Sequence, residues 1–507
     1  MQTPAPSINL VQMLPEIFLF VWAIAVMTLD LVTKRRSARL ITWFSMAGLV
    51  ITGIILWVIS SNGYQAGGFG MMFYNDPIAV FFKVIFLVAA FMAIGSSFGV
   101  VEKRISNHRG EFFGLILFST IGMMFLASSN ELLSLYIGLE LTTIPLFVLA
   151  AFFREERLSV EAGIKYLVIG ALSSAFLLYG LSFLYGLSGS TVLMQMKLNI
   201  SRVHLNNHGD IGLILVVSVM TILAGIGFKL ALPPFHQWAP DVYEGAPTPI
   251  ASFLSVGSKA AGLVAFAKIM VNALEPFHDP AMSPNDWGRL VGAMAVAAMV
   301  IGNVVAIQQT NIKRMMAYSS IAQAGYIMVG MLAMNGMGLS SVAFYMFAYM
   351  FANMGVFAII TIFEDKTGSC QIGSYSGLGK SSPFMAASMS VFLLSLAGIP
   401  PLAGFLSKYY VFAAAIKMAG TTPEFTWMYW VVGIALLTSV FALYYYAHVI
   451  KTMYFNKAVS PYKFGIQSPV MVVVVVALVG VVLFGLMPEP IIRFASQIPS
   501  AWGLSGQ

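Results

Sequence analysis

The sequence is a succession of apolar stretches that are each long enough to cross a lipid bilayer. A spanning helix needs about 20 mostly apolar residues, and 59% of this 507-residue chain is hydrophobic while only 9% is charged. We therefore predict an all-α polytopic membrane protein, because helices satisfy their own backbone hydrogen bonds in lipid. The predicted transmembrane helices number about fourteen, at residues 10–32, 40–60, 77–99, 112–128, 131–153, 161–187, 209–232, 247–271, 288–307, 314–335, 338–363, 384–418, 428–455 and 469–487.

The basic residues predict the orientation of these helices. Sixteen of the 27 lysines and arginines fall in loops that follow odd-numbered stretches, and only five fall in the other loops. Cytoplasmic loops of membrane proteins carry the excess of positive charge, so both termini are expected to face outward. The net charge of +7 then reflects loops that face anionic lipid. We expect membrane lipid as a partner and no nucleic acid.

Several kinds of chemistry find no support in the sequence. Cys370 is the single cysteine, and the six histidines are scattered without the spacing of metal ligands. We find no phosphate-binding loop and no glycine-rich turn for a dinucleotide. The chain is therefore expected to bind no metal and no cofactor. If it moves ions, the energy comes from a gradient or from a partner.

Two predicted helices are too long and contain paired prolines. Each covers 35 residues, at 211–245 and 384–418, or about 52 Å as straight helix against a hydrocarbon core of about 30 Å. Proline removes a backbone donor and clashes with the preceding turn. We therefore expect both helices to be broken in the membrane, with non-helical backbone at Leu232–Pro234 and Ile399–Leu402.

The two breaks lie five helices apart, in the seventh and twelfth predicted helices. Residues 112–271 and 288–455 would then form two five-helix repeats, each with its fourth helix broken. Because five is odd, the second repeat would enter the membrane inverted, as in many transporters whose interrupted helices mark the transport sites. A three-helix segment at 1–111 and a last helix at 469–487 would flank the repeats.

Four ionisable residues lie deep inside predicted helices: Glu140, Lys229, Lys259 and Lys408. A charge at the centre of a spanning helix costs roughly 2.5–3.5 kcal/mol, and such residues usually mark an ion or proton path. Lys229 and Lys408 each belong to one of the broken helices. The simpler alternatives are a structural ion pair for Glu140 and a lysine that extends to the interface for the others.

The remaining charged residues give weaker signals. Lys165 is either a proton relay or an interfacial anchor, and His236 either relays protons beside the break or caps free carbonyls. Lys83 and Lys268 lie near helix ends, where we expect their side chains to reach the interface. We interpret Asp241 and Glu244 as capping or loop residues.

Long segments of the sequence resemble a known family. YIGLELTTIPLF, GFKLALPPFHQWAPDVYEGAPTPI, AIQQTNIKRMMAYSSIAQAGY and LSLAGIPPLAGFLSK are similar to the subunit N family of bacterial NADH-quinone oxidoreductase, respiratory complex I. The resemblance covers residues 10 to 490. It implies an antiporter-like, proton-pumping subunit whose proton path includes Glu140, Lys165, Lys229, Lys259 and Lys408. It also implies that FMN, iron–sulfur clusters and quinone are bound by partner subunits, among them antiporter-like siblings.

Differences among the relatives favour this family over its siblings. The sibling subunit M has glutamate where this chain has Lys408, subunit L extends into a long lateral helix, and the chloroplast relative departs from the Gly-Leu-Glu at 138–140. Three alternatives stay open: a subunit of a multisubunit sodium/proton antiporter, a subunit of a membrane-bound hydrogenase, and a non-conducting scaffold.

Overall fold

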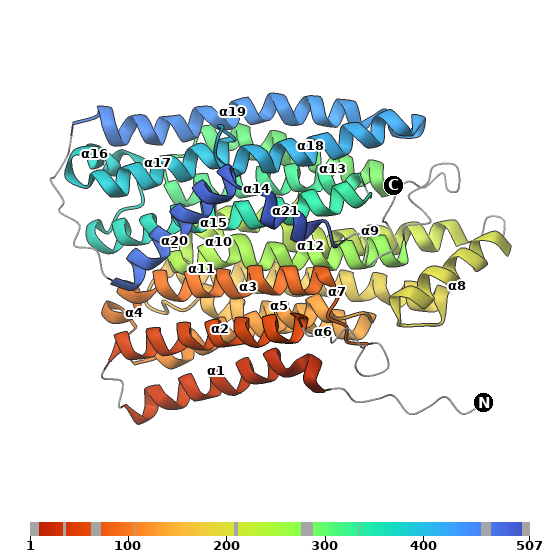
Figure 1. Cartoon of the computed structure of the whole chain (residues 1–507), viewed down its shortest axis with the longest axis horizontal. Helices are drawn as coiled ribbons and strands as arrows, with labels where there is room; N and C mark the ends of the chain where they lie inside the picture. The colour runs from red at the N-terminus through yellow and green to blue at the C-terminus, as the bar shows by residue number, and fades with distance from the viewer. Residues whose placement is uncertain are drawn as a thin grey trace.

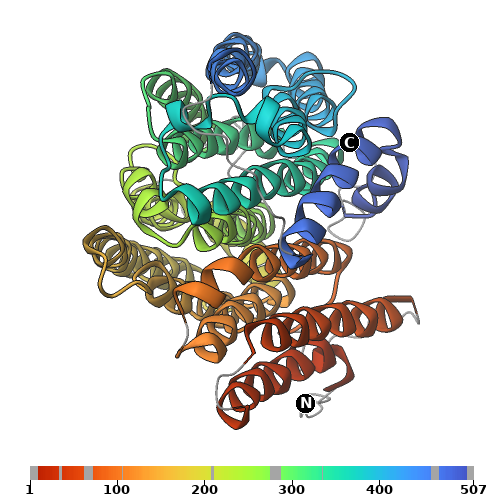
Figure 2. The same ribbon diagram turned by 90° about the vertical axis from the view of Figure 1, so that its left-hand side faces the viewer.

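The computed structural model describes residues 10–33, 37–61, 72–105, 107–206, 211–274, 287–333, 335–457 and 468–498. Its long helices run roughly parallel to one another in a single bundle (Figure 1). Seen along the helices, the N-terminal helices lie at one edge of the bundle and α19 lies at the opposite edge (Figure 2). Within the described residues, helices are joined by turns and isolated bridges and there is no strand, which confirms the all-α prediction.

The helices follow the predicted stretches closely. The N-terminal segment contains η1 (Leu10–Met13), α1 (Leu14–Val32), α2 (Ala38–Ser61), α3 (Pro77–Ser96) and α4 (Phe98–Lys103). Next come α5 (Arg109–Ser128), α6 (Leu132–Ala150), α7 (Arg157–Ser188), α8 (Leu193–Asn206), α9 (Ile211–Leu230), α10 (Trp238–Gly245), α11 (Thr248–Phe253), the π-helical η2 (Leu254–Ser258), α12 (Lys259–Ala267) and the π-helical η3 (Lys268–Ala273).

The second half contains α13 (Trp287–Ile307), α14 (Ile312–Leu332), α15 (Gly336–Thr367), η5 (Ile372–Tyr375), α16 (Leu378–Ser381), α17 (Pro383–Ala397), α18 (Ala403–Thr421), η6 (Pro423–Phe425) and α19 (Met428–Phe455). Two further helices, α20 (Ser468–Leu486) and α21 (Glu489–Ala495), follow. The α20 helix packs against both α15 and α3 and so connects the N-terminal segment to the second half.

Twelve helices in the described residues are long and apolar enough to cross a membrane. The predicted count of fourteen is therefore not reproduced by length and composition alone. The two predicted stretches outside the twelve are α14, which contains Lys313, Arg314 and Gln323, and the pair α17–α18, which a break divides into shorter pieces. Polar residues and a broken helix both lower the apolar signal without moving a helix out of the bundle.

Both predicted breaks are present. The α9 helix ends at Leu230, Ala231 has a φ of 54°, and α10 begins only at Trp238. The α17 helix ends at Ala397, and α18 begins at Ala403. Proline cannot continue the hydrogen-bond ladder, and carbonyls at the end of α17 accept side-chain hydrogen bonds instead, Leu396 from Gln323 and Ala397 from Lys408.

The helix pair α6–α7 resembles the pair α14–α15 in details that the sequence analysis did not predict. The α7 and α15 helices both have 32 residues and both end in a left-handed glycine, Gly189 and Gly368. An isolated antiparallel bridge closes the loops around each: Glu131 with Val192, and Asn311 with Gln371. Asn311 and Glu131 also cap the helix that follows them, because each side chain accepts a backbone N–H.

The loop residue Glu131 illustrates how such a cap affects ionisation. Partial burial opposes its charged form, but Ser134 donates both its backbone N–H and its hydroxyl to the carboxylate, at 2.9 and 2.6 Å. The hydrogen bonds outweigh the burial, and the pKa of Glu131 is lower than its ordinary value.

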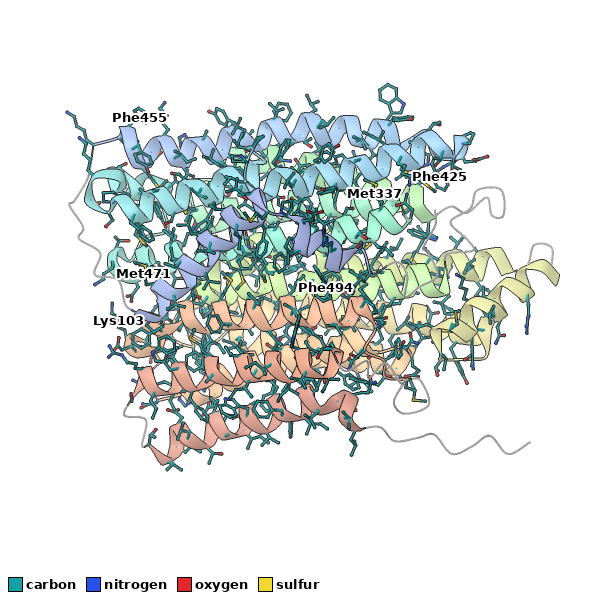
Figure 3. All side chains as sticks on the ribbon, viewed as in Figure 1. Lys103, Met337, Phe425, Phe455, Met471 and Phe494 are labelled. Atoms are coloured by element: carbon teal, nitrogen blue, oxygen red, sulfur yellow. The ribbon has the colours of Figure 1, made fainter. Side chains whose placement is uncertain are left out.

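The two ends of the bundle differ in charge. Lys103 and Phe455 lie at one end, and Met337 and Phe425 lie toward the other (Figure 3). The Lys103 end also holds the start of α14, with Lys313 and Arg314. The predicted positions of the two termini concern residues 1–9 and 499–507, and the predicted basic loop residues Lys34, Arg35, Arg36 and Lys463 also lie outside the described residues.

The prediction that Lys83 and Lys268 extend to the interface is wrong. Lys83 is fully buried, forms an ion pair with Glu16 at 2.5 Å and donates to Asn75 at 2.5 Å. Lys268 is 1% exposed and donates to the Ser129 carbonyl at 2.7 Å. Partners from α1 and from the loops before α3 and α6 keep both ammonium groups inside, and sequence spacing could not reveal them.

The Glu16–Lys83 pair makes a prediction for stability. Lys83→Met leaves the Glu16 carboxylate buried without its counterion, so we expect a loss of about 3–5 kcal/mol. The double variant Glu16→Leu/Lys83→Met replaces the pair by apolar groups and should recover most of that loss. Thermal unfolding of the detergent-solubilised protein would measure both, and a double variant no more stable than Lys83→Met would contradict the assignment.

Candidate functional site

Lys229 ends the α9 helix immediately before the first break, and its side chain points into the bundle. Lys229 is 3% exposed, and its Nζ donates to the hydroxyl of Thr143 on α6. The last turn of α9 is packed closely against α12, since a side chain at Gly262 would contact the Lys229 Cβ at 3.2 Å. The break therefore places an ammonium group next to the middle of α6.

Glu140 lies one turn before Thr143 on α6. Its Oε1 accepts a hydrogen bond from the Ser174 hydroxyl at 2.5 Å, while the Lys229 ammonium binds Thr143 instead. Glu140 and Lys229 nevertheless interact electrostatically through space. Glu140 is half-buried, at the edge of an apolar face of α6 that exposes Ile137, Leu141 and Ile144. The expected coupling distance of about 4–8 Å between the two charged groups stays a prediction.

Lys259 follows the π-helical turn η2 and is 2% exposed. Its Nζ donates to both the carbonyl and the hydroxyl of Ser320 on α14, the latter at 2.6 Å. The Ser320 hydroxyl also accepts from the Tyr349 hydroxyl at 3.0 Å and lies 3.4 Å from the Tyr243 hydroxyl. Four helices thus converge on one serine. Single π-helical turns occur frequently at functional sites.

Lys408 lies in α18, just after the second break. Its Nζ donates to the Ala397 carbonyl at 3.0 Å, which the break leaves free, and to the Ser439 hydroxyl at 2.9 Å. Gly398 has a φ of 89°, and a Cβ there would lie 3.1 Å from Lys408 Cδ. Glycine at this position therefore satisfies both the backbone conformation and the space that the lysine needs.

Polar groups fill the region between Lys259 and Lys408. Tyr345 donates to Gln323 Oε1, and Gln323 Nε2 donates to the Leu396 carbonyl at 3.2 Å. The Tyr446 hydroxyl lies 2.5 Å from the Ser319 hydroxyl. A small cavity lies beside Lys408; its lining includes Gln323, Tyr345, Tyr349, Ser395, Ser407 and Lys408. Hydroxyl groups and water can both carry protons across such a space.

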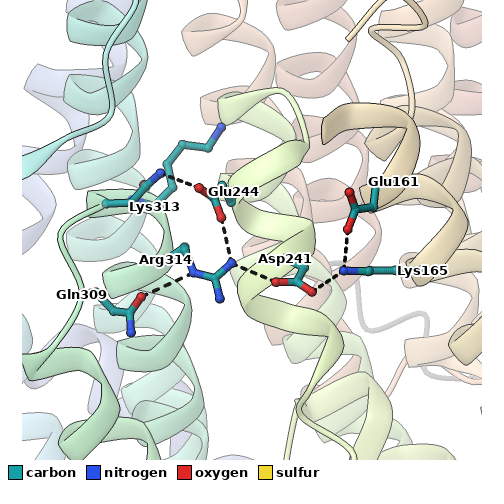
Figure 4. Close-up of polar contacts among 8 residues, drawn as sticks. Glu161, Lys165, Asp241, Glu244, Gln309, Lys313 and Arg314 are labelled. Carbon is teal, nitrogen blue, oxygen red and sulfur yellow. Dashed lines mark hydrogen bonds and ion pairs between the residues drawn. The ribbon is translucent and has the colours of Figure 1, made fainter. Parts of the chain in front are cut away.

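Lys165 belongs to an ion-pair network at the basic end of the bundle (Figure 4). It pairs with Asp241 at 2.6 Å and with Glu161 at 2.7 Å. Arg314 joins the network by donating to Asp241 and Glu244, both at 2.8 Å. The network ties α10, the short helix after the break, to both α7 and α14. Asp241 and Glu244 are therefore ion-pair partners, and the interpretation as capping or loop residues is wrong.

His236 lies within the first break and is partly buried. In the described part of the chain, its Nδ1 is buried and has no hydrogen-bond partner. No contact joins it to Lys229 or Lys165 among the interactions that the structure describes. Its role in the proton path stays a prediction.

Several polar residues of this site were not singled out from the sequence. Ser320, Gln323, Tyr345 and Tyr349 lie on α14 and α15 in apolar surroundings, where tyrosine and serine usually pack without special function. A signal was present: α14 contains five polar uncharged residues, at positions 318, 319, 320, 323 and 326, on neighbouring turns. Their partners on α12 and α19 are distant in sequence.

The comparisons with known proteins place the chain in a class. Residues 129–441 match the transmembrane family described as NADH:quinone oxidoreductase/Mrp antiporter. The chain is thus an antiporter-like membrane subunit.

Among curated relatives, subunit N of NADH-quinone oxidoreductase from Moorella thermoacetica is 40% identical, covering 96% of this chain and 98% of the relative. The corresponding subunit from Trichlorobacter lovleyi is 39% identical over 97% of both chains. The chain belongs to the NADH-quinone oxidoreductase subunit N family.

Solved structures agree with this assignment. A chain of respiratory complex I from Thermus thermophilus superposes with a TM-score of 0.76 at 29% identity, covering 95% of this chain and 99% of the other. A chain of the Mrp complex from Dietzia has a TM-score of 0.80 at 18% identity, covering 98% of each chain. At that identity the second likeness shows a shared fold alone.

Cys370 offers a test of the geometry at the basic end. Burial raises the pKa of its thiol to about 12, and the neighbouring Glu364 carboxylate acts in the same direction. Because only the thiolate is nucleophilic, alkylation at pH 7 should be about a thousandfold slower than for a thiol of pKa 9, and should accelerate as pH rises. Maleimide labelling of the intact protein, with glutathione as the reference, would measure this. Equal rates would contradict the burial.

Proposed function

We propose that this chain translocates protons in the membrane arm of an NADH-quinone oxidoreductase and has no redox chemistry of its own. The observation that supports this most strongly is the series of buried lysines, Lys229, Lys259 and Lys408, each hydrogen-bonded to a hydroxyl or a carbonyl of a neighbouring helix. Intramembrane charges are costly and usually mark ion pathways. Names of the relatives and their membership in oxidoreductase complexes support the same assignment.

The proposed path begins with Glu140 and Lys229. When the two groups approach, the ammonium is stabilised by the carboxylate; when they separate, Lys229 can release its proton toward Lys259. The buried Tyr166 hydroxyl interacts electrostatically with Glu140, and we propose it as a further group on this stretch. From Lys259, Ser320 and the tyrosines of α15 lead to Lys408.

The proposed row of lysines lies at one depth, parallel to the membrane. Like charges repel strongly in a medium of low dielectric constant. The protonation of one lysine should therefore depend on that of the next. Lys408, beside the second break, would be the last group before the outside, with Lys165 and His236 as auxiliary groups near the first break.

The proposed domain organisation is two inverted repeats, 112–271 and 288–455, flanked by 1–111 and 469–487. Three observations support it besides the Pro-Pro pairs. They are the matching 32-residue helices α7 and α15, their glycine ends, and the bridges at Glu131 and Asn311. The Asn311 bridge lies at the basic end beside Arg314, and an inverted repeat requires the Glu131 bridge to lie at the other end.

The proposed partners are the other membrane subunits of the oxidoreductase, including antiporter-like siblings, and membrane lipid. FMN, iron–sulfur clusters and quinone would be bound by those partners. In the described residues no group of three or more histidine, cysteine, aspartate or glutamate side chains could hold a metal ion. A sodium/proton antiporter subunit is the second candidate, because the matching family is described as NADH:quinone oxidoreductase/Mrp antiporter.

Lys259→Ala tests the proton path. We expect proton pumping and quinone reduction to fall together by about tenfold or more, because a positioned proton-transfer group is lost although no substrate is touched. NADH oxidation and acidification of membrane vesicles, measured on the assembled complex, would show it. Normal assembly with full coupled activity would leave Lys259 a structural residue.

We propose that both termini face outward, because the basic end of the bundle would be cytoplasmic. Cys370 follows α15 at that end and provides the test. A membrane-impermeant maleimide at alkaline pH should label Cys370 in inside-out vesicles and not in right-side-out cells. The reverse pattern would overturn the orientation.

A further inference from the structure

An open pocket of about 410 Å³ lies at the basic end of the bundle. Its wall contains Lys103, Arg104 and Glu156, and its floor contains Thr248, Thr361 and Glu364. The pocket therefore joins the proposed cytoplasmic surface to the beginning of α11, the helix that continues into η2 and Lys259. A volume of this size holds many water molecules.

Glu364 is the ionisable group on the floor of this pocket that touches the bundle interior. Its side chain is 28% exposed, so water in the pocket can reach it. Its carboxylate accepts from the Thr248 hydroxyl at the start of α11 and lies 3.6 Å from Lys313 Nζ. Asp365, its neighbour, pairs instead with Lys103 at 2.7 Å on the pocket wall.

Two polar stripes face each other between Glu364 and Lys259. The helix from α11 through η2 presents polar residues one turn apart, at positions 248, 252, 255 and 259. The antiparallel α15 presents polar residues at positions 364, 361, 353 and 349. Contacts connect the stripes at three levels: Thr248 with Glu364, Ser255 with Asn353 at 2.5 Å, and Lys259 with Tyr349 through Ser320.

Asn353 carries a free hydrogen-bond acceptor in the middle of the seam, the interface between these two polar stripes. Asn353 is fully buried, and its Oδ1 has no hydrogen-bond partner in the described residues. A buried unsatisfied amide oxygen costs about 1–3 kcal/mol, and a water molecule between the stripes would satisfy it. Phe357 lies one turn nearer to the pocket on α15, and the polar residue of the other stripe at this level is Ser252. Because Phe357 is apolar, we expect the formation of a continuous water chain at this level to limit proton transfer.

We propose that Glu364 is the cytoplasmic proton-loading group for Lys259. A hydronium ion in the pocket water gives a proton to the Glu364 carboxylate: one of its O–H bonds breaks, an O–H bond forms on Glu364, and a neutral water remains. The O–H bond of Glu364 then breaks, and its proton moves through water along Ser252, Ser255 and Asn353 to the neutral amine of Lys259, where an N–H bond forms. The carboxylate is restored and takes the next proton from the pocket. This inference rests on the proposed function, and it adds a loading site to a path defined by the central lysines.

The competing role for Glu364 is structural, since it caps α11 and neighbours Lys313. Two substitutions separate the roles. Glu364→Gln keeps the side-chain length and an oxygen that accepts from Thr248, but it cannot carry the proton. Glu364→Asp keeps the carboxylic acid and shortens the reach to Thr248. Asp365→Asn is the matched control, because it removes a neighbouring carboxylate in the same pocket.

The experiment measures NADH oxidation and vesicle acidification by the assembled complex in which this chain is the sole copy. We expect Glu364→Gln to lower pumping by about tenfold, Glu364→Asp to retain most of it, and Asp365→Asn to leave it unchanged, with equal amounts of complex in each membrane. Asn353→Leu, which removes the amide from the seam, should lower pumping as Glu364→Gln does.

The opposite pattern would overturn the inference. If Glu364→Gln pumps normally, or if Glu364→Asp is the more damaging of the two, Glu364 is a structural cap. If Asp365→Asn is as damaging as Glu364→Gln, the pocket charge as a whole matters and Glu364 has no specific role. Lys259→Ala, measured in parallel, keeps the two proposals apart: a pumping Lys259→Ala variant would refute the proposed function, whereas its loss together with a normal Glu364→Gln would refute only the loading site.

Discussion

The burial of lysine ammonium groups is the constraint on which the rest of this structure depends. An isolated ammonium in a medium of low dielectric constant is too costly to keep charged, so each buried lysine needs oxygen atoms around it. The fold supplies them from three sources: serine and threonine hydroxyls on neighbouring helices, a carbonyl freed by a helix break, and the Glu16 carboxylate. The hydrogen-bond acceptors of the three proposed proton carriers, Lys229, Lys259 and Lys408, are neutral groups. Lys83 instead pairs with the Glu16 carboxylate.

This difference has a physical consequence. In a tight buried ion pair the lysine keeps its proton, because deprotonation would leave the carboxylate without its counterion and the amine without its charge partner. A lysine hydrogen-bonded to hydroxyls has weaker stabilisation of the charged form and can exchange its proton with a small reorganisation of the neighbours. The chemistry of the hydrogen-bond partner, as much as the depth of the lysine, therefore distinguishes a lysine that transfers protons from one that forms a structural ion pair. By this criterion, Lys83 forms a structural ion pair that links α3 to α1, and Lys259 is suited to exchange its proton.

Most of the long helices could be predicted from the sequence, although α8 lies outside the predicted stretches and the count of fourteen is not reproduced. The contacts between the helices could not be predicted. Apolar length located the helices, and the Pro-Pro pairs located both breaks, because these signals are local in the chain. The predictions for Lys83 and Lys268 were wrong because of partners outside their own helices. Lys83 is held by Glu16 of α1 and by Asn75, which is 8 positions away, and Lys268 by Ser129, which is 139 positions away. The α14 helix shows the same limit: its polar residues weaken the apolar signal, yet they form the centre of the site through partners on α12, α15 and α19.

The ion-pair network around Asp241 connects the two halves of the bundle through α10, the short helix that follows the first break. Asp241 is shared by Lys165 of α7 and Arg314 of α14, so any shift of α10 changes its distance to both cations. Exposed pairs of this kind contribute little to stability singly, and here they join one helix of each proposed repeat to the same carboxylate. A change in the charge near Lys229 that moves the end of α9 would also displace α10, because the break connects the two helices directly. Because Arg314 begins the helix that contains Ser320, the same displacement would reach the group that binds Lys259. The first and second halves thus have a physical connection at the basic end of the bundle, in addition to the polar groups between Lys259 and Lys408.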